Sequence, residues 1–377
     1  MPEVRGVPQV RVLHMADMHL EWPFTGLGAR GRLRREELKT VFAGIIDLAV
    51  RESVQVLLIA GDLLEQQYAT RGTARFLDQQ FRRIPDTHVF ISPGNHDPYL
   101  PGDLYETYGW AENIHIFGPE PERIDIAGLP VSVLGWGFPA WEVRQWQLGR
   151  VPAGDPGRIN LAVIHGGEGV YHPFGAAELA ALQCDYVALG HIHRRGVVLE
   201  EVGRVLAQYP GSPEGLGFGE PGEHGVLLGN VGKDSTRMAF VPTSARRYET
   251  IAVDVSDAAA TDDLVAAIRR VAPADERRQH CYRLELTGSV DPDLTVDANL
   301  LEEWLREEFY LLQVSDRTQP DYDLAALSAE RSVRGAFVRR LLEQEALESG
   351  EDGRRRIRRA LALGLAAFSE RGGRRAT

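Results

Sequence analysis

Between residues 8 and 240 the chain alternates short apolar runs with segments of helical periodicity. The run Gln9–Met15 predicts a strand, and Val54–Ala60 (VQVLLIA) is apolar enough to predict a strand that is fully buried. Between them, Arg34–Arg51 carries apolar residues at helical spacing. Further strands are predicted at His88–Ser92, Val131–Leu134, Ile159–Ile164 and Tyr186–Leu189, and further helices at Ala74–Arg83 and Ala176–Leu182. This alternation predicts a layered α/β domain.

Beyond about residue 244 the pattern changes to a small α+β unit followed by helices. Strands are predicted at Tyr248–Val255, Cys281–Leu286 and Phe309–Ser315, and helices at Asp262–Val271 and Val296–Arg306. Two helical segments, Leu324–Leu347 and Arg354–Phe368, flank the turn sequence SGEDG and predict a helical hairpin. We therefore expect three parts: an α/β domain at 1–244, a small α+β domain at 245–320, and a helical hairpin with a basic tail at 321–377.

Composition narrows the class of protein. The 377 residues suffice for two domains, and 44% hydrophobic with 25% charged residues excludes a disordered chain. No apolar run approaches the ~18 residues of a membrane span, and the N-terminus lacks the apolar core of a signal peptide. The two cysteines, Cys184 and Cys281, are too few and too distant for a disulfide framework. These features predict a soluble, cytoplasmic protein.

The net charge of −12 is unevenly distributed. Residues 350–377 hold eight arginines and three acidic residues, a net charge of +5 that leaves −17 for the rest. A broad basic surface for nucleic acid is therefore excluded. A polyanionic ligand must instead be held by a local patch, by metal ions or by a partner subunit.

Five short polar clusters follow the predicted strands at their carboxyl ends. They are Asp17-Met18-His19, Gly61-Asp62, Gly94-Asn95-His96-Asp97, His165-Gly166 and Gly190-His191-Ile192-His193. Ligands of open α/β sheets bind at the carboxyl ends of strands, so these clusters are expected to converge. Mixed Asp, Asn and His donors suit Mn, Fe or Zn, and two such ions need a bridging carboxylate with further ligands on each side. The candidate ligands are Asp17, His19, Asp62, Asn95, His165, His191 and His193.

The order DxH, GD, GNHD, strand-end His and GHxH resembles the signature of the calcineurin-like metallophosphoesterases. More narrowly, LHMADMHL and YPGSPEGLGFGE resemble segments of SbcD-type DNA repair exonucleases, and ADMHLEWPFTGL is most similar to their YhaO branch. The resemblance implies a layered β-sandwich flanked by helices, followed by a cap that positions DNA. It also implies a metal-dependent phosphodiesterase, a DNA exonuclease or endonuclease, with two divalent ions. Manganese is the first expectation, and iron or zinc is the alternative.

The resemblance also implies a role for each site residue. One ion would be bound by Asp17, His19 and His193, and the other by Asn95, His165 and His191. Asp62 would bridge the two ions. His96 would protonate the leaving oxygen and Asp97 would orient His96. Arg194 and Arg195 directly follow the last cluster and could bind substrate phosphates, or could simply be solvated.

Other features favour structural roles. Six further histidines stand in no polar cluster, which favours structural or surface roles; they are His14, His88, His115, His172, His224 and His280. Six aromatic residues on predicted loops are better explained by packing than by base stacking; they are Trp22, Phe24, Trp136, Phe138, Trp141 and Trp146. The arginines at positions 30, 32, 34 and 35 suit a solvated loop and helix start better than a phosphate site.

Partners and rival functions stay open at this stage. In SbcD-type nucleases a C-terminal helical segment docks onto the coiled-coil base of an SMC-like ATPase, which here could supply the charge that grips DNA. The hairpin could equally fold onto its own chain or form a homodimer. Rival functions are hydrolysis of a small phosphodiester or phosphomonoester, and a structural subunit of an ATPase–DNA complex. The complete ligand set favours an enzyme.

Overall fold

The computed structural model describes residues 8–28, 30–151, 154–167, 169–233 and 235–372. The chain divides into two compact units, Met1–Glu249 and Thr250–Thr377. The ends of the expected first and third domains, residues 1–7 and 373–377, lie outside the described residues. No helix within the described ranges is both long and apolar enough to cross a membrane.

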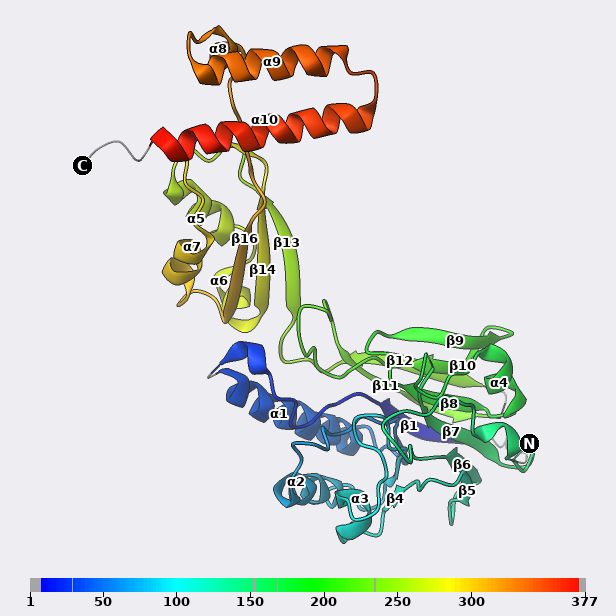
Figure 1. Ribbon diagram of the computed structural model, residues 1–377. Helices are drawn as coiled ribbons and strands as arrows, with labels where there is room; N and C mark the ends of the chain where they lie inside the picture. The colour runs from blue at the N-terminus through cyan, green and yellow to red at the C-terminus, as the bar shows by residue number, and fades with distance from the viewer. Residues whose placement is uncertain (1–7, 29, 152–153, 168, 234, 373–377) are drawn as a thin grey trace, which may run out of the picture. The chain divides into compact units, whose positions relative to one another are not determined.

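The first unit contains two six-stranded mixed sheets (Figure 1). The first has the order β12-β11-β1-β2-β3-β4 and the second the order β5-β6-β7-β8-β10-β9. The strands of the first sheet are β1 (Gln9–Met15), β2 (Val56–Ile59), β3 (His88–Ile91), β4 (Ile114–Ile116), β11 (Gly225–Gly232) and β12 (Thr236–Pro242). Those of the second are β5 (Glu122–Asp125), β6 (Val131–Gly135), β7 (Ile159–His165), β8 (Tyr186–Gly190), β9 (Gly196–Glu201) and β10 (Arg204–Tyr209). The strands β1 to β4 run parallel, as do β6, β7, β8 and β10.

The two sheets pack face to face, and alternation along each strand divides its side chains between two cores. In β2, Val56 and Leu58 join the core between the sheets, whereas Leu57 and Ile59 join the core under the helices. Both faces of the strand are buried, which is why its sequence is a continuous apolar run. Each such fully buried side chain contributes roughly 1.5–3 kcal/mol. The expected layered β-sandwich is confirmed.

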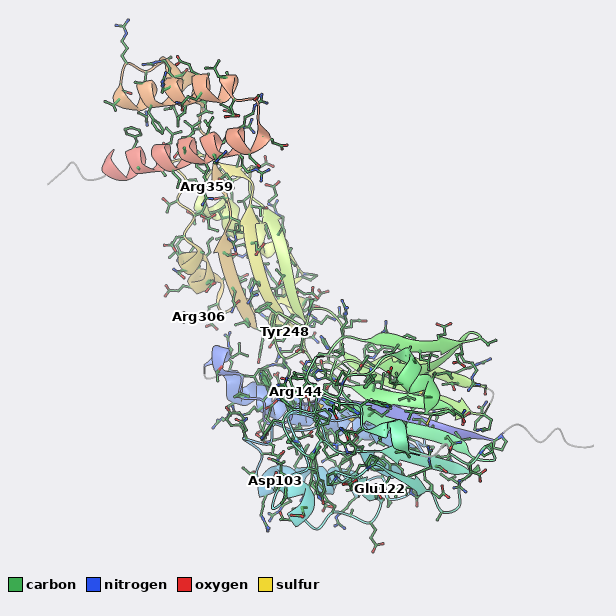
Figure 2. The ribbon with its side chains drawn as sticks, turned by 45° about the vertical axis from the view of Figure 1, so that its right-hand side comes forward. Asp103, Glu122, Arg144, Tyr248, Arg306 and Arg359 are labelled. Carbon is green, nitrogen blue, oxygen red and sulfur yellow. The ribbon has the colours of Figure 1, made fainter. Side chains whose placement is uncertain are left out.

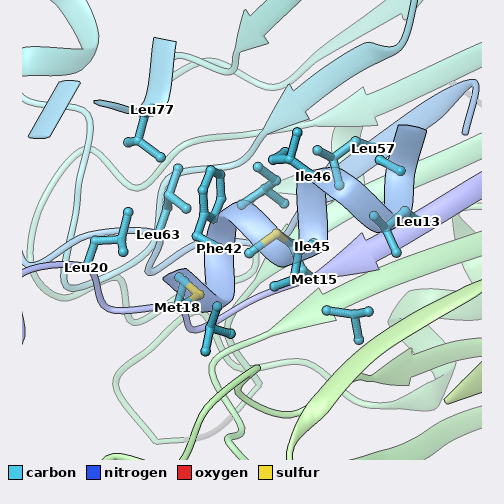
Figure 3. Packing of buried hydrophobic residues seen from close by; sticks show 14 of the residues in the cluster. Leu13, Met15, Met18, Leu20, Phe42, Ile45, Ile46, Leu57, Leu63 and Leu77 are labelled. Atoms are coloured by element: carbon cyan, nitrogen blue, oxygen red, sulfur yellow. The ribbon is translucent and has the colours of Figure 1, made fainter. Parts of the chain in front are cut away.

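Helices cover the outer face of the first sheet. The long helix α1 (Arg30–Arg51) packs Phe42, Ile45 and Ile46 onto Leu13 and Met15 of β1 (Figure 3). Next to it lies α2 (Arg71–Phe81), which begins at the capping residue Thr70. The short segments are η1 (Thr25–Leu27), α3 (Leu104–Thr107), η2 (Leu148–Arg150) and α4 (Ala176–Ala181), of which α4 packs on the second sheet.

A buried arginine ties α1 to the segment Tyr209–Glu220. Arg34 is fully buried, and its guanidinium donates hydrogen bonds to Glu37 at 2.6 Å and to Glu214 at 2.7 Å. Glu214 also accepts the backbone N–H groups of Ala245 and Arg246. Arg34 therefore has a structural role, but the expectation that it is solvated is wrong, because its guanidinium is buried against Glu214. Through Glu214, the segment Tyr209–Glu220 contributes to the stability of the fold.

We predict that Arg34→Met destabilises the protein by about 3–5 kcal/mol, because Glu214 would be left as an unpaired buried carboxylate. Chemical denaturation monitored by circular dichroism measures this loss. The matched control is Arg32→Met, since Arg32 is exposed on the same helix. Equal stability of the two variants would contradict the structural role of Arg34.

The second unit is an α+β layer followed by helices. Its three-stranded sheet has the order β13-β14-β16, and Figure 2 shows Tyr248 at the start of β13 and Arg306 at the end of α7. The elements are β13 (Tyr248–Asp254), α5 (Thr261–Arg269), α6 (Ala274–Gln279), β14 (Cys281–Thr287), β15 (Ser289–Val290), α7 (Ala298–Leu305), β16 (Leu311–Asp316) and β17 (Gln319–Pro320). Leu264, Leu284 and Leu301 are fully buried in its own hydrophobic core.

The C-terminal helices differ from the pattern in one respect. The segment predicted as one helix, Leu324–Leu347, is two helices, α8 (Leu324–Ala329) and α9 (Val333–Leu347). Ser332 starts α9 by accepting the N–H of Gly335, and a Cβ on Gly335 would lie 2.3 Å from the Glu330 carbonyl oxygen. The last helix, α10 (Glu351–Gly372), packs Leu361 and Leu365 around Val338 of α9, and Arg359 lies on its surface (Figure 2). Whether 245–320 and 321–377 act as separate domains stays a prediction.

Candidate metal centre

The five polar clusters meet at the carboxyl ends of strands from both sheets. Asp17 and His19 follow β1, Asp62 follows β2, and Asn95 follows β3. From the second sheet, His165 ends β7, and His191 and His193 follow β8. Asp17, His19 and His165 are fully buried, and Asp62 is 1% exposed. The seven side chains come together in the structure, as predicted.

The backbone is strained where these side chains enter the site. Asp17, His19, Asp62 and His191 have φ angles of 54°, 48°, 50° and 106°. Non-glycine residues rarely adopt positive φ, and each costs of order 1–3 kcal/mol that the surrounding fold must offset. Gly94 allows a close approach of the two ligand loops, because a Cβ there would lie 2.3 Å from Asp62 Oδ1. Backbone strain at residues that carry candidate ligands is typical of a functional site.

Distances divide the donors into two groups around Asp62. Asp17, His19 and His193 form one group and Asp62, His165 and His191 the other, each with ligand atoms within 4.8 Å of one another. Asp62 Oδ2 lies 3.3 Å from His165 Nε2 and 3.9 Å from His19 Nε2. Asn95 Oδ1 lies 2.9 Å from His165 Nε2 and 3.1 Å from His191 Nδ1. Asp62 is thus the carboxylate between the two groups.

Three histidines are held by acceptors on their outer nitrogen. His19 Nδ1 donates to Glu65 at 2.7 Å, His193 Nδ1 to Glu220 at 2.7 Å, and His165 Nδ1 to the Ala60 carbonyl at 2.8 Å. This arrangement selects the tautomer whose Nε2 lone pair faces inward. His19 Nε2 and His193 Nε2 then face each other at 3.0 Å, which is repulsive unless a cation or proton is shared. The donor set therefore fits divalent cations.

The pKa values reflect the same crowding of donors. Burial alone would lower the pKa of His165, but Asp62 and Asp17 raise it to about 9. Burial likewise opposes charge on His193, but Glu220 and Asp17 raise its pKa to about 9. Burial and the neighbouring His165 lower the pKa of His191 to about 4. A cation that binds here therefore displaces protons from His165 and His193.

His96 lies at the edge of the cluster. Its side chain is 37% exposed, and its Nδ1 is 2.9 Å from Glu65 Oε1. Its backbone N–H donates to Asp62 Oδ1 at 2.8 Å, which ties it to the ligand cluster. The position suits a group that meets a substrate from the solvent side.

Asp97 differs from its expected role as the residue that orients His96. It is fully buried, and its carboxylate accepts the N–H groups of Asp62 at 3.0 Å and Gly94 at 2.7 Å and the Tyr105 hydroxyl at 2.6 Å. The carboxylate against His96 is that of Glu65. Asp97 therefore holds the two ligand loops together, because a buried carboxylate needs several donors.

Sequence reasoning missed Glu65 and Glu220. Glu65 contacts both His19 and His96, and Glu220 contacts His193. A signal existed for both. Glu65 follows Asp62 by three residues in GDLLE, and Glu220 ends the segment YPGSPEGLGFGE. Nothing in the sequence pairs either carboxylate with its histidine, because the partners lie 46 and 27 positions away.

Structural roles are found for several of the remaining histidines and aromatics. His14 bonds to the Tyr186 hydroxyl at 2.8 Å, and His172 stacks on Trp146 with ring centroids 4.9 Å apart. Trp136 and Phe138 are buried in the core of the second sheet. Arg194 and Arg195 are exposed and line a pocket of about 780 Å³ together with His191 and His193.

We predict that Glu220→Gln weakens Mn²⁺ binding by about 10–100-fold, as expected for loss of an outer partner that orients a ligating histidine. Calorimetric titration with Mn²⁺ measures the effect. The control is Glu223→Gln, because Glu223 is exposed and paired with Arg247 rather than with a histidine. Unchanged affinity in Glu220→Gln would show that His193 needs no such partner.

The comparisons with known proteins agree with this site. Residues 10–195 match the model of the family described as calcineurin-like phosphoesterase. These residues therefore form a calcineurin-like metallophosphoesterase domain, as the motifs led us to expect, and the family is one of metal-dependent phosphoesterases.

Three curated relatives are similar over larger parts of the chain. The uncharacterized metallophosphoesterase YhaO of Bacillus subtilis (strain 168) is 29% identical over 84% of this chain and 83% of its own. The DNA double-strand break repair protein Mre11 of Saccharolobus solfataricus is 25% identical over 66% of this chain and 67% of its own. Mre11 of Methanopyrus kandleri is 26% identical over 55% and 50%, respectively.

Proposed function

We propose that this protein is a dinuclear metal-dependent phosphodiesterase that hydrolyses DNA, a DNA repair exonuclease or endonuclease. The observation that carries the proposal is the convergence of seven ligand-type side chains, Asp62 and six around it, with His96 at their edge. Similarity to two Mre11 proteins, each named for DNA double-strand break repair, supports DNA as the substrate.

In the proposed centre, Asp17, His19 and His193 hold one ion, and Asn95, His165 and His191 hold the other, with Asp62 shared. Manganese is the proposed ion, and iron and zinc accept the same nitrogen and oxygen donors. When bound, such a pair supplies Lewis acidity and lowers the pKa of a coordinated water. The chain itself contributes neutral, correctly oriented imidazoles, because Glu65, Glu220 and the Ala60 carbonyl hold their outer nitrogens.

His96 is the proposed general acid. Its Nδ1 is engaged by Glu65 at 2.9 Å, so its Nε2 can deliver a proton to the departing sugar oxygen. Glu65 also accepts a hydrogen bond from His19. The same carboxylate therefore positions both the proposed general acid, His96, and the proposed metal ligand, His19. Arg194 and Arg195 are the proposed contacts to substrate phosphates, since arginine suits bidentate phosphate binding.

Two further proposals concern the second unit. Residues 245–320 are proposed to position DNA, as the cap does in the SbcD-type family. Residues 321–377 are proposed to dock onto an SMC-like coiled-coil ATPase that supplies the basic surface this acidic chain lacks. Exposed Arg355, Arg356 and Arg359 on α10 support a contact with an acidic surface of that partner.

The test is Mn²⁺-dependent degradation of end-labelled single- and double-stranded DNA, with bis-p-nitrophenyl phosphate hydrolysis in parallel. Release of labelled products by the wild-type chain is expected, and the ladder reveals the polarity. Cleavage of the small ester alone, with and without an SMC-like ATPase partner, would instead favour a small phosphodiester as the substrate. Absence of both activities would favour a structural subunit.

A further inference from the structure

A pocket opens directly beside the metal centre, in the first unit. It has a volume of about 780 Å³ and lies between the loop that carries His191 and His193, the segments 210–212 and 219–224, and Phe240 of β12. Pockets that hold drug-sized ligands span ~300–1,000 Å³, so this one is large enough for a nucleotide. His191 and His193 line both this pocket and the candidate metal centre. A ligand in the pocket would therefore lie next to the phosphodiester bond that the centre is proposed to hydrolyse.

The charges of the pocket leave it selective for an anion. Its two carboxylates are engaged, Glu220 by His193 at 2.7 Å and Glu223 by Arg247 at 2.8 Å. Arg194 and Arg195 are exposed and form no ion pair with a carboxylate anywhere in the described part of the chain. By contrast, Arg34 and Arg246 of the same unit are paired with Glu37. Two guanidinium groups that line the pocket and pair with no carboxylate of the described chain are therefore available to bind a phosphate.

The guanidinium group of Arg195 lies against the aromatic ring of Phe240. Arg195 Cζ lies 4.4 Å from the centroid of the Phe240 ring. Such a cation–π contact limits the motion of a long side chain and presents its planar guanidinium as a platform. Planar bases stack on arginine and on aromatic rings with little dependence on sequence. The pair thus offers a base-binding surface in a pocket that is also lined by His191 and His193 of the metal centre.

We propose that this pocket binds the nucleotide adjacent to the scissile phosphate. Arg194 contacts its phosphate and the Arg195–Phe240 pair supports its base. The inference rests on the proposed phosphodiesterase function and deepens it, because it names a deoxynucleotide, read without regard to base identity, as the unit that the site recognises. An ester without a base would gain nothing from the pocket.

The experiment compares ligands with and without a base, in the presence of Mn²⁺. Calorimetry measures the affinity of deoxyadenosine 3′- and 5′-monophosphate, of deoxyribose 5-phosphate and of inorganic phosphate for the full chain. We expect at least one deoxyadenosine monophosphate to bind about fivefold or more tightly than deoxyribose 5-phosphate, from base stacking alone. Arg195→Gln and Phe240→Leu should bring this ratio close to one. Arg237→Gln, an exposed arginine on the same strand that does not line the pocket, should leave it unchanged.

Each outcome is decisive. Equal affinity for the ligands with and without a base, or a ratio that survives both pocket substitutions, would overturn the nucleotide pocket even if DNA is cleaved. A ratio that is lost only in the two pocket variants supports the pocket, even if DNA is not cleaved. In that case the proposed DNA substrate fails, while the nucleotide pocket stands. The binding assay and the DNA cleavage assay therefore fail independently.

Discussion

Asp62→Asn is expected to remove hydrolytic activity and most of the bound metal while the fold survives. The carboxylate lies between the two donor groups, 3.3 Å from His165 Nε2 and 3.9 Å from His19 Nε2, so its charge serves both. Asparagine keeps the shape of the side chain, can still accept the His96 N–H, and tolerates the positive φ of 50°. Loss of an outer partner already costs ~10–100-fold, so loss of this shared ligand should cost more than about 100-fold in both Mn²⁺ affinity and rate.

Metal content after dialysis and hydrolysis of bis-p-nitrophenyl phosphate measure the two effects of Asp62→Asn. Circular dichroism confirms the fold. The control is Asp125→Asn, an exposed aspartate on β5 that is remote from the cluster in sequence. Retention of two equivalents of Mn²⁺ by Asp62→Asn would remove the shared-ligand role and with it the dinuclear centre.

His96→Gln is expected to lower the rate of DNA hydrolysis by about 10²–10⁴-fold, the usual contribution of a general acid, without loss of metal. The effect should depend on the leaving group. A sugar oxygen needs a proton to depart, whereas p-nitrophenolate is stable as an anion. The loss on bis-p-nitrophenyl phosphate should therefore be much smaller than the loss on DNA. Parallel kcat measurements on both substrates test this difference. His115→Gln is the control, because His115 pairs with Glu122 and belongs to none of the donor groups of the centre.

A competing interpretation of His96 is also testable. His19, Glu65 and His96 form a third group whose ligand atoms lie within 4.8 Å of one another. If His96→Gln loses metal, or loses activity equally on both substrates, His96 is a ligand and not the acid. Intact metal content with a leaving-group-dependent loss is the result that assigns it the proton.

Local information accounts for much of the agreement between sequence and structure. The strands β1, β2, β3 and β7 place apolar residues on both faces, so their sequences reveal them without knowledge of their neighbours. By contrast, no individual strands were predicted between residues 196 and 242, where β9 to β12 lie. β9 and β12 are largely exposed or half-buried edge strands, and β11 contains glycines that pack against the backbone of its neighbour. Their identity as strands depends on pairing, which local pattern does not encode.

The same division applies to the site. The sequence by itself determined the donor types and their places at strand ends, because turns after buried strands must carry the polar residues and glycines that the chemistry uses. It also determined the family. Only the tertiary structure decided that Glu65 rather than Asp97 lies against His96, that Glu220 holds His193, and that Arg34 is buried rather than solvated. These are contacts between residues up to 180 positions apart, and their energy depends on burial and distance, which exist only once the sheets have packed.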